Sequence, residues 1–273
     1  MGVLLGLLCA LGFGSGDYLG GRATRTSPAP AVVLVMQLAG ATGMAVVVAI
    51  YHPSGVSAAD ITRGASAGAI GCVGLGLLYW LLAHRRAAVV APITSVVATL
   101  MPVAWGFVRG ERPSGAAIAG IVVALIGITF VSGLGRGPLE GVGLSVVTGG
   151  LFGTTLILFA STAHSSGLWP VFAGRWAAVV AVIGFSLAVR KLQLPTGTDR
   201  TMSAAAGVLD TAGNVFVQLA VRHGLLSVVA PLFALGPAVT VLLTRGLDGE
   251  QVGVERAVGI GLSIVGVALL SLA

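Results

Sequence analysis

The sequence predicts an all-α, polytopic membrane protein with ten transmembrane helices arranged as two inverted five-helix repeats. Of its 273 residues, 56% are apolar and only 9% are charged, whereas about a quarter of a soluble domain is charged. Apolar stretches of about 20 residues recur along the whole chain, and each is long enough to cross a hydrocarbon core of ~30 Å. The two halves also resemble each other at a fixed offset of 139 positions.

Ten apolar stretches define the expected helices in chain order, and short loops join them. They cover residues 2–21, 31–51, 62–83, 88–108, 115–134, 141–163, 168–189, 202–221, 227–244 and 252–270. No stretch alternates polar and apolar residues as a barrel strand would, so a helical bundle is the expected architecture. The first stretch lacks the basic start of a secretion signal and is expected to be a mature helix. In the ninth, Pro231 is expected to open the helix and Pro237 to kink it.

The internal repeat becomes visible when the sequence is moved along itself by 139 positions. The matched segments include Val89-Val90-Ala91-Pro92 with Val228-Val229-Ala230-Pro231, Gly110-Glu111 with Gly249-Glu250, Gly120-Ile121 with Gly259-Ile260, Phe13-Gly14 with Phe152-Gly153, Gly68 with Gly207, and Gly74 with Gly213. Glu111 and Glu250 therefore occupy matched loop positions, where we expect them to order the turns.

The repeats are expected to cover residues 1–134 and 140–273 and to form one bundle. Each holds five spans, an odd number, so the second copy enters the membrane from the opposite side. Inverted repeats of this kind are a recurrent construction of secondary transporters, whose solute site lies near the midplane between the copies.

The basic residues are distributed in a way that predicts topology rather than nucleic-acid binding. The formal net charge is +6, but the arginines occur singly or in pairs along the connecting loops. Ten of the 15 basic residues lie in or beside the odd-numbered loops and four in or beside the even-numbered ones. The positive-inside rule then places the odd loops in the cytoplasm and both termini outside.

Residue types that would indicate an enzyme or a cofactor are poorly placed for either. Cys9 and Cys72 fall within apolar spans, where a small buried side chain is the expected role and a disulfide is not. The four histidines lie near span ends without a metal-ligand or catalytic-triad spacing, and the sequence has no phosphate-binding loop. We therefore expect no cofactor, no metal and no enzymatic activity.

Three charged residues lie within predicted spans, namely Asp17, Arg175 and Asp210. Each costs about 2.5 to 3.5 kcal/mol at a helix centre, so such residues usually face a cavity or a partner. Helical rise places Asp17 and Asp210 within roughly 5 Å of each other in depth, with Arg175 nearer the opposite face. None of the three has a charged counterpart in the other repeat.

Uncharged polar residues extend this set of candidate solute-binding residues. Asn214 and Gln218 follow Asp210 at four-residue intervals, which places all three on one face of the eighth helix. Gln37 in the second span is a further candidate, although a lone amide also serves to bond a neighbouring helix.

Two interpretations of the buried charges remain open at this point. Arg175 could neutralise one aspartate in a buried pair that only orders the bundle. Alternatively, at least one carboxylate binds a cationic group of the solute or carries a proton, since burial disfavours its charged form. A passive structural protein would not explain the polar stripe on the eighth helix.

An intramembrane aspartyl protease is the alternative function, because Gly14-Ser15-Gly16-Asp17 fits a G-x-G-D pattern and Asp210 could supply a second catalytic carboxylate. In the presenilin and signal peptide peptidase group, however, a Tyr-Asp aspartate precedes the G-x-G-D motif and a Pro-Ala-Leu motif follows it. Here Leu209 precedes Asp210, the order of the two aspartates is reversed, and Pro-Ala-Leu does not occur.

The segments Val228-Val229-Ala230-Pro231, Gly249-Glu250 and Gly259-Ile260, with their partial copy in the first half, resemble the EamA-like domain of the drug/metabolite transporter superfamily. The resemblance covers essentially the whole chain. It implies ten helices in two inverted repeats around a central cavity. Phe13-Gly14 takes the place of the Trp-Gly pair that many members carry in the first helix.

Members of that superfamily move amino acids, other small metabolites, sugar phosphates or drugs, often outward. We therefore expect a secondary transporter in a bacterial cytoplasmic membrane that exports an amino acid, an amine or a drug-like solute by alternating access. Its partners would be the lipid bilayer, the solute and protons, while its oligomeric state is left open. The resemblance implies cytoplasmic termini, opposite to the charge distribution, so both orientations stay open.

Overall fold

The computed structural model describes residues 1–51, 55, 57–85, 87–132, 141–188, 194–249 and 253–271. These residues form α-helices joined by short connections and contain no β-strand. The helices are α1 (Gly2–Ala23), α2 (Ala29–Tyr51), α3 (Ala58–His84), α4 (Ala87–Val108), α5 (Gly115–Ser132), α6 (Val142–Ala160), η1 (His164–Ser166), α7 (Trp169–Ala188), α8 (Gly197–His223), α9 (Leu226–Phe233), α10 (Gly236–Asp248) and α11 (Val254–Ser271).

The helices confirm the prediction of an all-α, polytopic membrane protein. In the described part of the chain, seven segments are long and apolar enough to cross a membrane, and two shorter apolar helices cover residues 93–108 and 115–130. Each predicted span coincides with a helix, apart from the ninth, which α9 and α10 share.

The ninth span is interrupted rather than kinked. The helix α9 ends at Phe233, and α10 begins at Gly236 with Pro237 in its first turn. Proline has no N–H to donate to the carbonyl four residues earlier, which is that of Phe233, so the helix stops there. The prediction that Pro231 opens this span was wrong, because α9 begins at Leu226 and Pro231 lies inside it.

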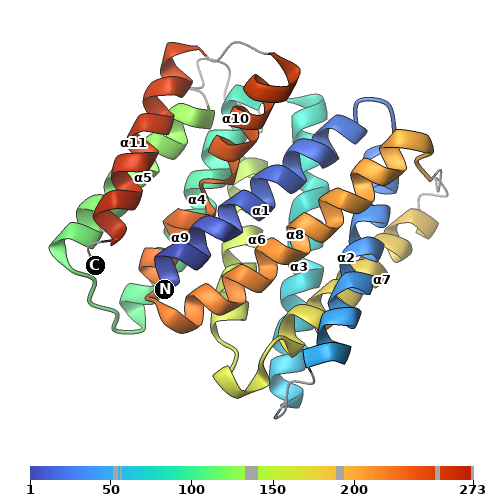
Figure 1. Ribbon diagram of the computed structural model, residues 1–273, viewed down its shortest axis with the longest axis horizontal. Coiled ribbons are helices and arrows are strands. Elements are labelled where there is room, and N and C mark those ends of the chain that lie inside the picture. The colour runs from blue at the N-terminus through green and yellow to red at the C-terminus, as the bar shows by residue number, and fades with distance from the viewer. Residues whose placement is uncertain are drawn as a thin grey trace.

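The two repeats exchange helices rather than standing side by side. The third helix of each repeat packs against the first two helices of the other: α8 packs on α1 and α2, while α3 packs on α6 and α7 (Figure 1). Other large contacts also join helices of opposite repeats, since α2 packs against α7 and α5 packs against α11. A two-fold relation between the repeats requires this pattern of partners.

The contact between α5 and α11 shows why glycines repeat at the 139-residue offset. A Cβ added to Gly120 would lie 3.0 Å from the carbonyl oxygen of Gly266, and one added to Gly127 would lie 3.0 Å from that of Gly259. Gly120 matches Gly259 in the repeat, and Gly127 matches Gly266, so the two contacts are copies of each other. Small residues here let the helix backbones approach closely.

A second duplicated contact joins the first and third helices of opposite repeats. Phe13 on α1 lies against Gly213 on α8, whose added Cβ would be 2.7 Å from the ring. Phe152 on α6 lies in the same way against Gly74 on α3, at 3.0 Å. The matched phenylalanines and glycines of the sequence thus occupy one contact that occurs twice.

Candidate solute site

A cavity of about 790 Å³ lies between the repeats and is lined by residues of both. Five of the six residues that the sequence analysis selected line it, namely Asp17, Gln37, Arg175, Asp210 and Asn214. They come from four helices, α1, α2, α7 and α8. The rare polar residues of the spans therefore meet in one place, while their contact with solute stays a prediction.

The polar centre of this site is an ion pair between a buried arginine and a partly exposed aspartate. The Arg175 guanidinium on α7 lies 2.6 Å from the Asp210 carboxylate on α8. The same Nη1 donates a hydrogen bond of 2.9 Å to Oε1 of Gln37 on α2. Only 7% of the Arg175 side chain is exposed, and a buried charge of this kind is tolerated when it is paired and hydrogen-bonded. The long side chain of Arg175 thus reaches the Asp210 carboxylate, while the expected difference in depth between the two helix positions stays a prediction.

Asp17 differs from Asp210 because no cation in the described part of the chain forms an ion pair with it. Its side chain is exposed to the cavity, and it makes no hydrogen bond or ion pair with any residue that the structure describes. It lies close to the ion pair, since a Cβ added to the neighbouring Gly16 would be 3.5 Å from the Asp210 Cβ. The cavity thus holds one paired and one unpaired carboxylate.

The polar stripe on α8 divides between the cavity and the protein interior. Asn214 lines the cavity, although its amide donates to the backbone carbonyl of Asp210 at 2.9 Å. Gln218 is fully buried and does not line the cavity. Its Nε2 donates instead to the Thr162 hydroxyl at 2.7 Å, and its Oε1 has no partner among the described residues.

Aromatic and hydroxyl-bearing side chains, which the sequence analysis did not select, complete the lining. The aromatic residues are Phe13, Phe152, Phe159 and Phe233. Hydroxyl groups come from Thr94, Ser95, Thr155, Thr240 and Thr244. The match of Phe13 with Phe152 in the repeat was the available signal for the first two. The site therefore combines a largely apolar wall with a few polar groups, which is typical of small-molecule pockets.

The cavity reaches only one end of the bundle. Its lining extends to Arg25, Arg245 and Arg256, all at the end of the bundle that holds the odd-numbered loops. We call this end the odd-loop face. The opposite end, here called the terminal face, holds the starts of α1 and α3, the corner at residues 161–168 between α6 and α7, and the end of α11 (Figure 1). Toward the terminal face the lining ends at Phe159, Val171 and Phe233, and it includes no residue of the corner at 161–168.

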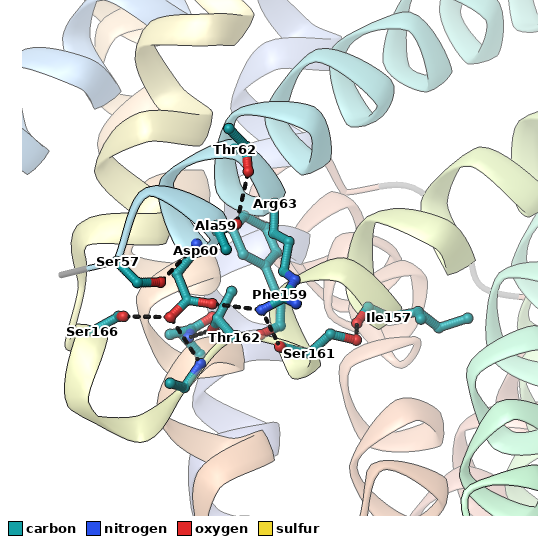
Figure 2. A network of polar contacts seen from close by, with 12 residues as sticks. Ser57, Ala59, Asp60, Thr62, Arg63, Ile157, Phe159, Ser161, Thr162 and Ser166 are labelled. Atoms are coloured by element: carbon teal, nitrogen blue, oxygen red, sulfur yellow. Dashed lines mark hydrogen bonds and ion pairs between the residues drawn. The ribbon is translucent and has the colours of Figure 1, made fainter.

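A buried carboxylate that the sequence analysis missed lies at the terminal face (Figure 2). Asp60, 1% exposed, accepts hydrogen bonds from the Ser166 hydroxyl at 2.6 Å and the Ala163 N–H at 3.2 Å. It also lies 2.8 Å from Arg63, which donates in turn to the Ser161 carbonyl. The network ties the start of α3 to the corner between α6 and α7, outside the cavity lining.

Glu111 also connects the two repeats. Its carboxylate accepts hydrogen bonds from the N–H groups of Leu226 and Ser227 at 2.8 and 2.9 Å, and from the Ser227 hydroxyl at 2.6 Å. These donors open α9, so Glu111 caps a helix of the other repeat in addition to any role in its own turn. The matched Glu250 lies outside the described residues.

Comparison with known proteins identifies the family. The model of the EamA-like transporter family matches residues 1–133 and matches again at residues 140–272. The chain belongs to the EamA-like transporter family. This confirms the resemblance noted from the sequence, and the protein is accordingly a multi-pass membrane transporter of small solutes. Members of this family are transporters rather than enzymes, which argues against the aspartyl protease alternative.

The other similarities concern fold and part of the sequence. One crystal structure has a TM-score of 0.80 and 17% identity to this chain, covering 99% of this chain and 98% of its own, and shows a common fold. The uncharacterized protein MJ1333.1 of Methanocaldococcus jannaschii is 35% identical over 72 residues, which is 26% of this chain. The matching region spans 53% of that protein.

Proposed function

We propose that this EamA-like protein is a secondary transporter that exports a small amine-bearing solute through alternating access around the central cavity. The solute would be an amino acid, a simple amine or a drug-like amine. The observation that carries the proposal is the unpaired Asp17 carboxylate, which faces the cavity beside an already neutralised pair.

The pairing of charges at the centre of the site, away from the arginines at its open end, favours a cationic group. Arg175 neutralises Asp210, so the carboxylate of Asp17 is left without a counter-ion in a low-dielectric environment. An uncompensated charge there is costly, and a ligand that brings a positive charge offsets that cost. A proton is the other species that neutralises a carboxylate. Competition between solute and proton for Asp17 would couple outward solute movement to inward proton movement.

The rest of the lining suits the uncharged part of such a solute. Four phenylalanines offer apolar surface and ring faces, which attract organic cations. The volume of about 790 Å³ falls within the ~300–1,000 Å³ of pockets that bind drug-sized molecules.

The distribution of basic residues supports export from a bacterial cytoplasm. If the odd-loop face is cytoplasmic, as the positive-inside rule suggests, the cavity opens toward the compartment from which solute is removed. Alternating access would then close that face and open the terminal face.

Efflux from proteoliposomes tests the proposal. Vesicles loaded with a mixed pool of amino acids, amines, organic acids and neutral metabolites would be followed by mass spectrometry for wild type, Asp17→Asn and Asp210→Asn. Wild type should release amines selectively, and both variants should lose that release. Asp199→Asn, which changes a carboxylate on α8 outside the cavity lining, is the matched control and should retain amine efflux. Wild-type vesicles that release no solute, or that release amines equally well with Asp17→Asn, would contradict the proposal.

A further inference from the structure

The exchange of helices between repeats defines two structural units. One consists of α1, α2 and α8, and the other of α6, α7 and α3, because each third helix packs mainly on the first two helices of the opposite repeat. Contacts between α8 and the pair α6 and α7 are sparse by comparison. Side-chain hydrogen bonds therefore fall into two groups, those within one unit and those between the two units.

Each unit contains one of two matching hydrogen bonds between an aspartate and a serine. Asp60 on α3 accepts from Ser166 at the start of the α7 segment at 2.6 Å, and Asp199 on α8 accepts from Ser27 before α2 at 2.6 Å. Asp199 follows Asp60 by 139 residues, and Ser166 follows Ser27 by the same number. The two bonds are therefore copies of one joint at opposite faces of the bundle.

Both joints are formed although the cavity reaches only the odd-loop face. If such a hydrogen bond kept its face of the bundle closed, it would be broken at the open face and intact at the closed face. The joint at Asp199 lies on the open side, and its length equals that of the joint at Asp60 on the closed side. The joints thus hold each unit together and do not decide which face is open.

A different pair of bonds connects the two units at the closed terminal face. Near the end of α8, Gln218 donates to the Thr162 hydroxyl at 2.7 Å, and Arg222 donates to the Gly167 carbonyl at 2.6 Å. Both acceptors belong to the corner between α6 and α7, in the other unit. Gln218 is fully buried, so the hydrogen bond that its side-chain amide donates is shielded from water.

These bonds have no copy in the sequence at the open face. One repeat length before Gln218 and Arg222 stand Tyr79 and Ala83, and one repeat length before Thr162 stands Ala23. Alanine has neither donor nor acceptor in its side chain. The bonds across the units at the terminal face are therefore specific to the second repeat, unlike the joints.

We infer that Gln218 and Arg222 form a gate that holds the terminal face closed, while Asp60 and Asp199 are permanent joints of the two moving units. The inference rests on the proposed function in supposing that the units move during transport. Opening the terminal face would break the bonds of Gln218 and Arg222 to residues 162–167 and leave both joints intact. Removing the gate shifts the population toward the state that is open at that face.

Cross-linking distinguishes a gate from a joint. Cys9→Ala and Cys72→Ala would first provide a background without thiols. The gate pair is Thr162→Cys with Gln218→Cys, and the joint pair is Asp60→Cys with Ser166→Cys. After oxidation, with bond formation verified by mass spectrometry, the gate pair should stop efflux and the joint pair should not. Reduction should restore efflux in the gate pair. Continued efflux through the oxidised gate pair, or a block by the oxidised joint pair, would overturn the assignment.

Accessibility of the cavity tests the gate without any solute. A cysteine placed by Ala98→Cys in the cavity wall of the same background would be labelled by a membrane-impermeant maleimide in vesicles of each orientation. Adding Gln218→Ala or Arg222→Ala should raise the labelling rate from the terminal face about tenfold. Adding Ser27→Ala, at the joint of the open face, is the matched control and should not raise it. An unchanged rate with both gate variants would refute the gate. Raised labelling without efflux of any solute would support the gate and contradict the proposed function.

Discussion

The two faces of the bundle have equivalent joints within the units, but they differ in the hydrogen bonds that connect one unit to the other. Asp60 and Asp199 make equivalent bonds to serines at opposite faces. By contrast, the central pair of Arg175 with Asp210 and the bond of Gln218 to Thr162 occur once. On the proposals made above, contacts retained in both copies preserve the units, while contacts present in one copy set the solute site and the conformational state. Substitutions in the two classes of contact should therefore differ in their effects on stability and transport.

Loss of Arg175 should have the largest effect on stability. In Arg175→Ala, the partly buried Asp210 carboxylate is left beside Asp17 without a counter-charge, so we expect the free energy of unfolding to fall by about 2 kcal/mol or more. Denaturant unfolding in detergent micelles, followed by circular dichroism, measures it. Combining Arg175→Ala with Asp210→Asn should recover part of the loss. A single variant as stable as wild type would show that the pair is not a structural element of the site.

Removal of the joint at Asp60 should cost less than loss of the central pair. Asp60→Ala leaves the Ser166 hydroxyl and the Ala163 N–H without their acceptor at a buried position, so we expect a loss of about 2 kcal/mol. Asp199→Ala should cost less than Asp60→Ala, because Asp199 is less buried and its donors can bond water. Equal losses in the same unfolding assay would contradict this ranking.

Glu111→Gln should have a smaller effect, about 1 kcal/mol, because the amide keeps an acceptor oxygen for the start of α9 but loses the negative charge. Thermal unfolding followed by tryptophan fluorescence would report it. Glu255→Gln, at an exposed position in the first turn of α11, is the control and should change stability by less than about 0.5 kcal/mol. If Glu255→Gln lowers stability as much as Glu111→Gln, the effect of Glu111→Gln cannot be attributed to the helix cap.

Asp17→Asn should be the least destabilising of these substitutions and still abolish amine transport. The carboxylate has no partner among the described residues, so the amide costs no bond, and it removes an uncompensated charge, so we expect no loss of stability. Unfolding and efflux measured on one preparation would separate the two effects. A destabilisation comparable to that of Arg175→Ala would indicate that Asp17 has a structural partner instead of a free role in the cavity.

Much of the fold could be predicted from the sequence because a membrane leaves few alternatives. Long apolar stretches must be helical, and an odd number of spans per repeat forces inversion. The break between α9 and α10 was predicted only as a kink, because Pro237 alone does not show whether the chain bends or stops. The predicted start of the ninth span at residue 227 lies one residue after the start of α9, which Glu111 of the other repeat caps.

The candidate site was easier to find than the joints. Charges within apolar spans are rare, so Asp17, Arg175 and Asp210 stood out and converge in the structure. Asp60 lies at a span end, where a carboxylate is normally solvated, and sequence alone did not show its burial. Its match with Asp199 at the repeat offset was the signal that could have revealed it. The spacing of Gln218 from Asp210 predicted which side of α8 it occupies. It did not predict that the cavity ends before Gln218 on the way to the terminal face.

The central claim is that the Asp17 carboxylate recognises a positive charge on the solute. The most direct measurement is exchange of a radiolabelled primary amine in proteoliposomes, in competition with the unlabelled amine and with the alcohol of the same shape. We predict that the amine competes with wild type, that the alcohol does not, and that Asp17→Asn abolishes the exchange while remaining folded. Equal competition by the alcohol, or full exchange by Asp17→Asn, would contradict the claim.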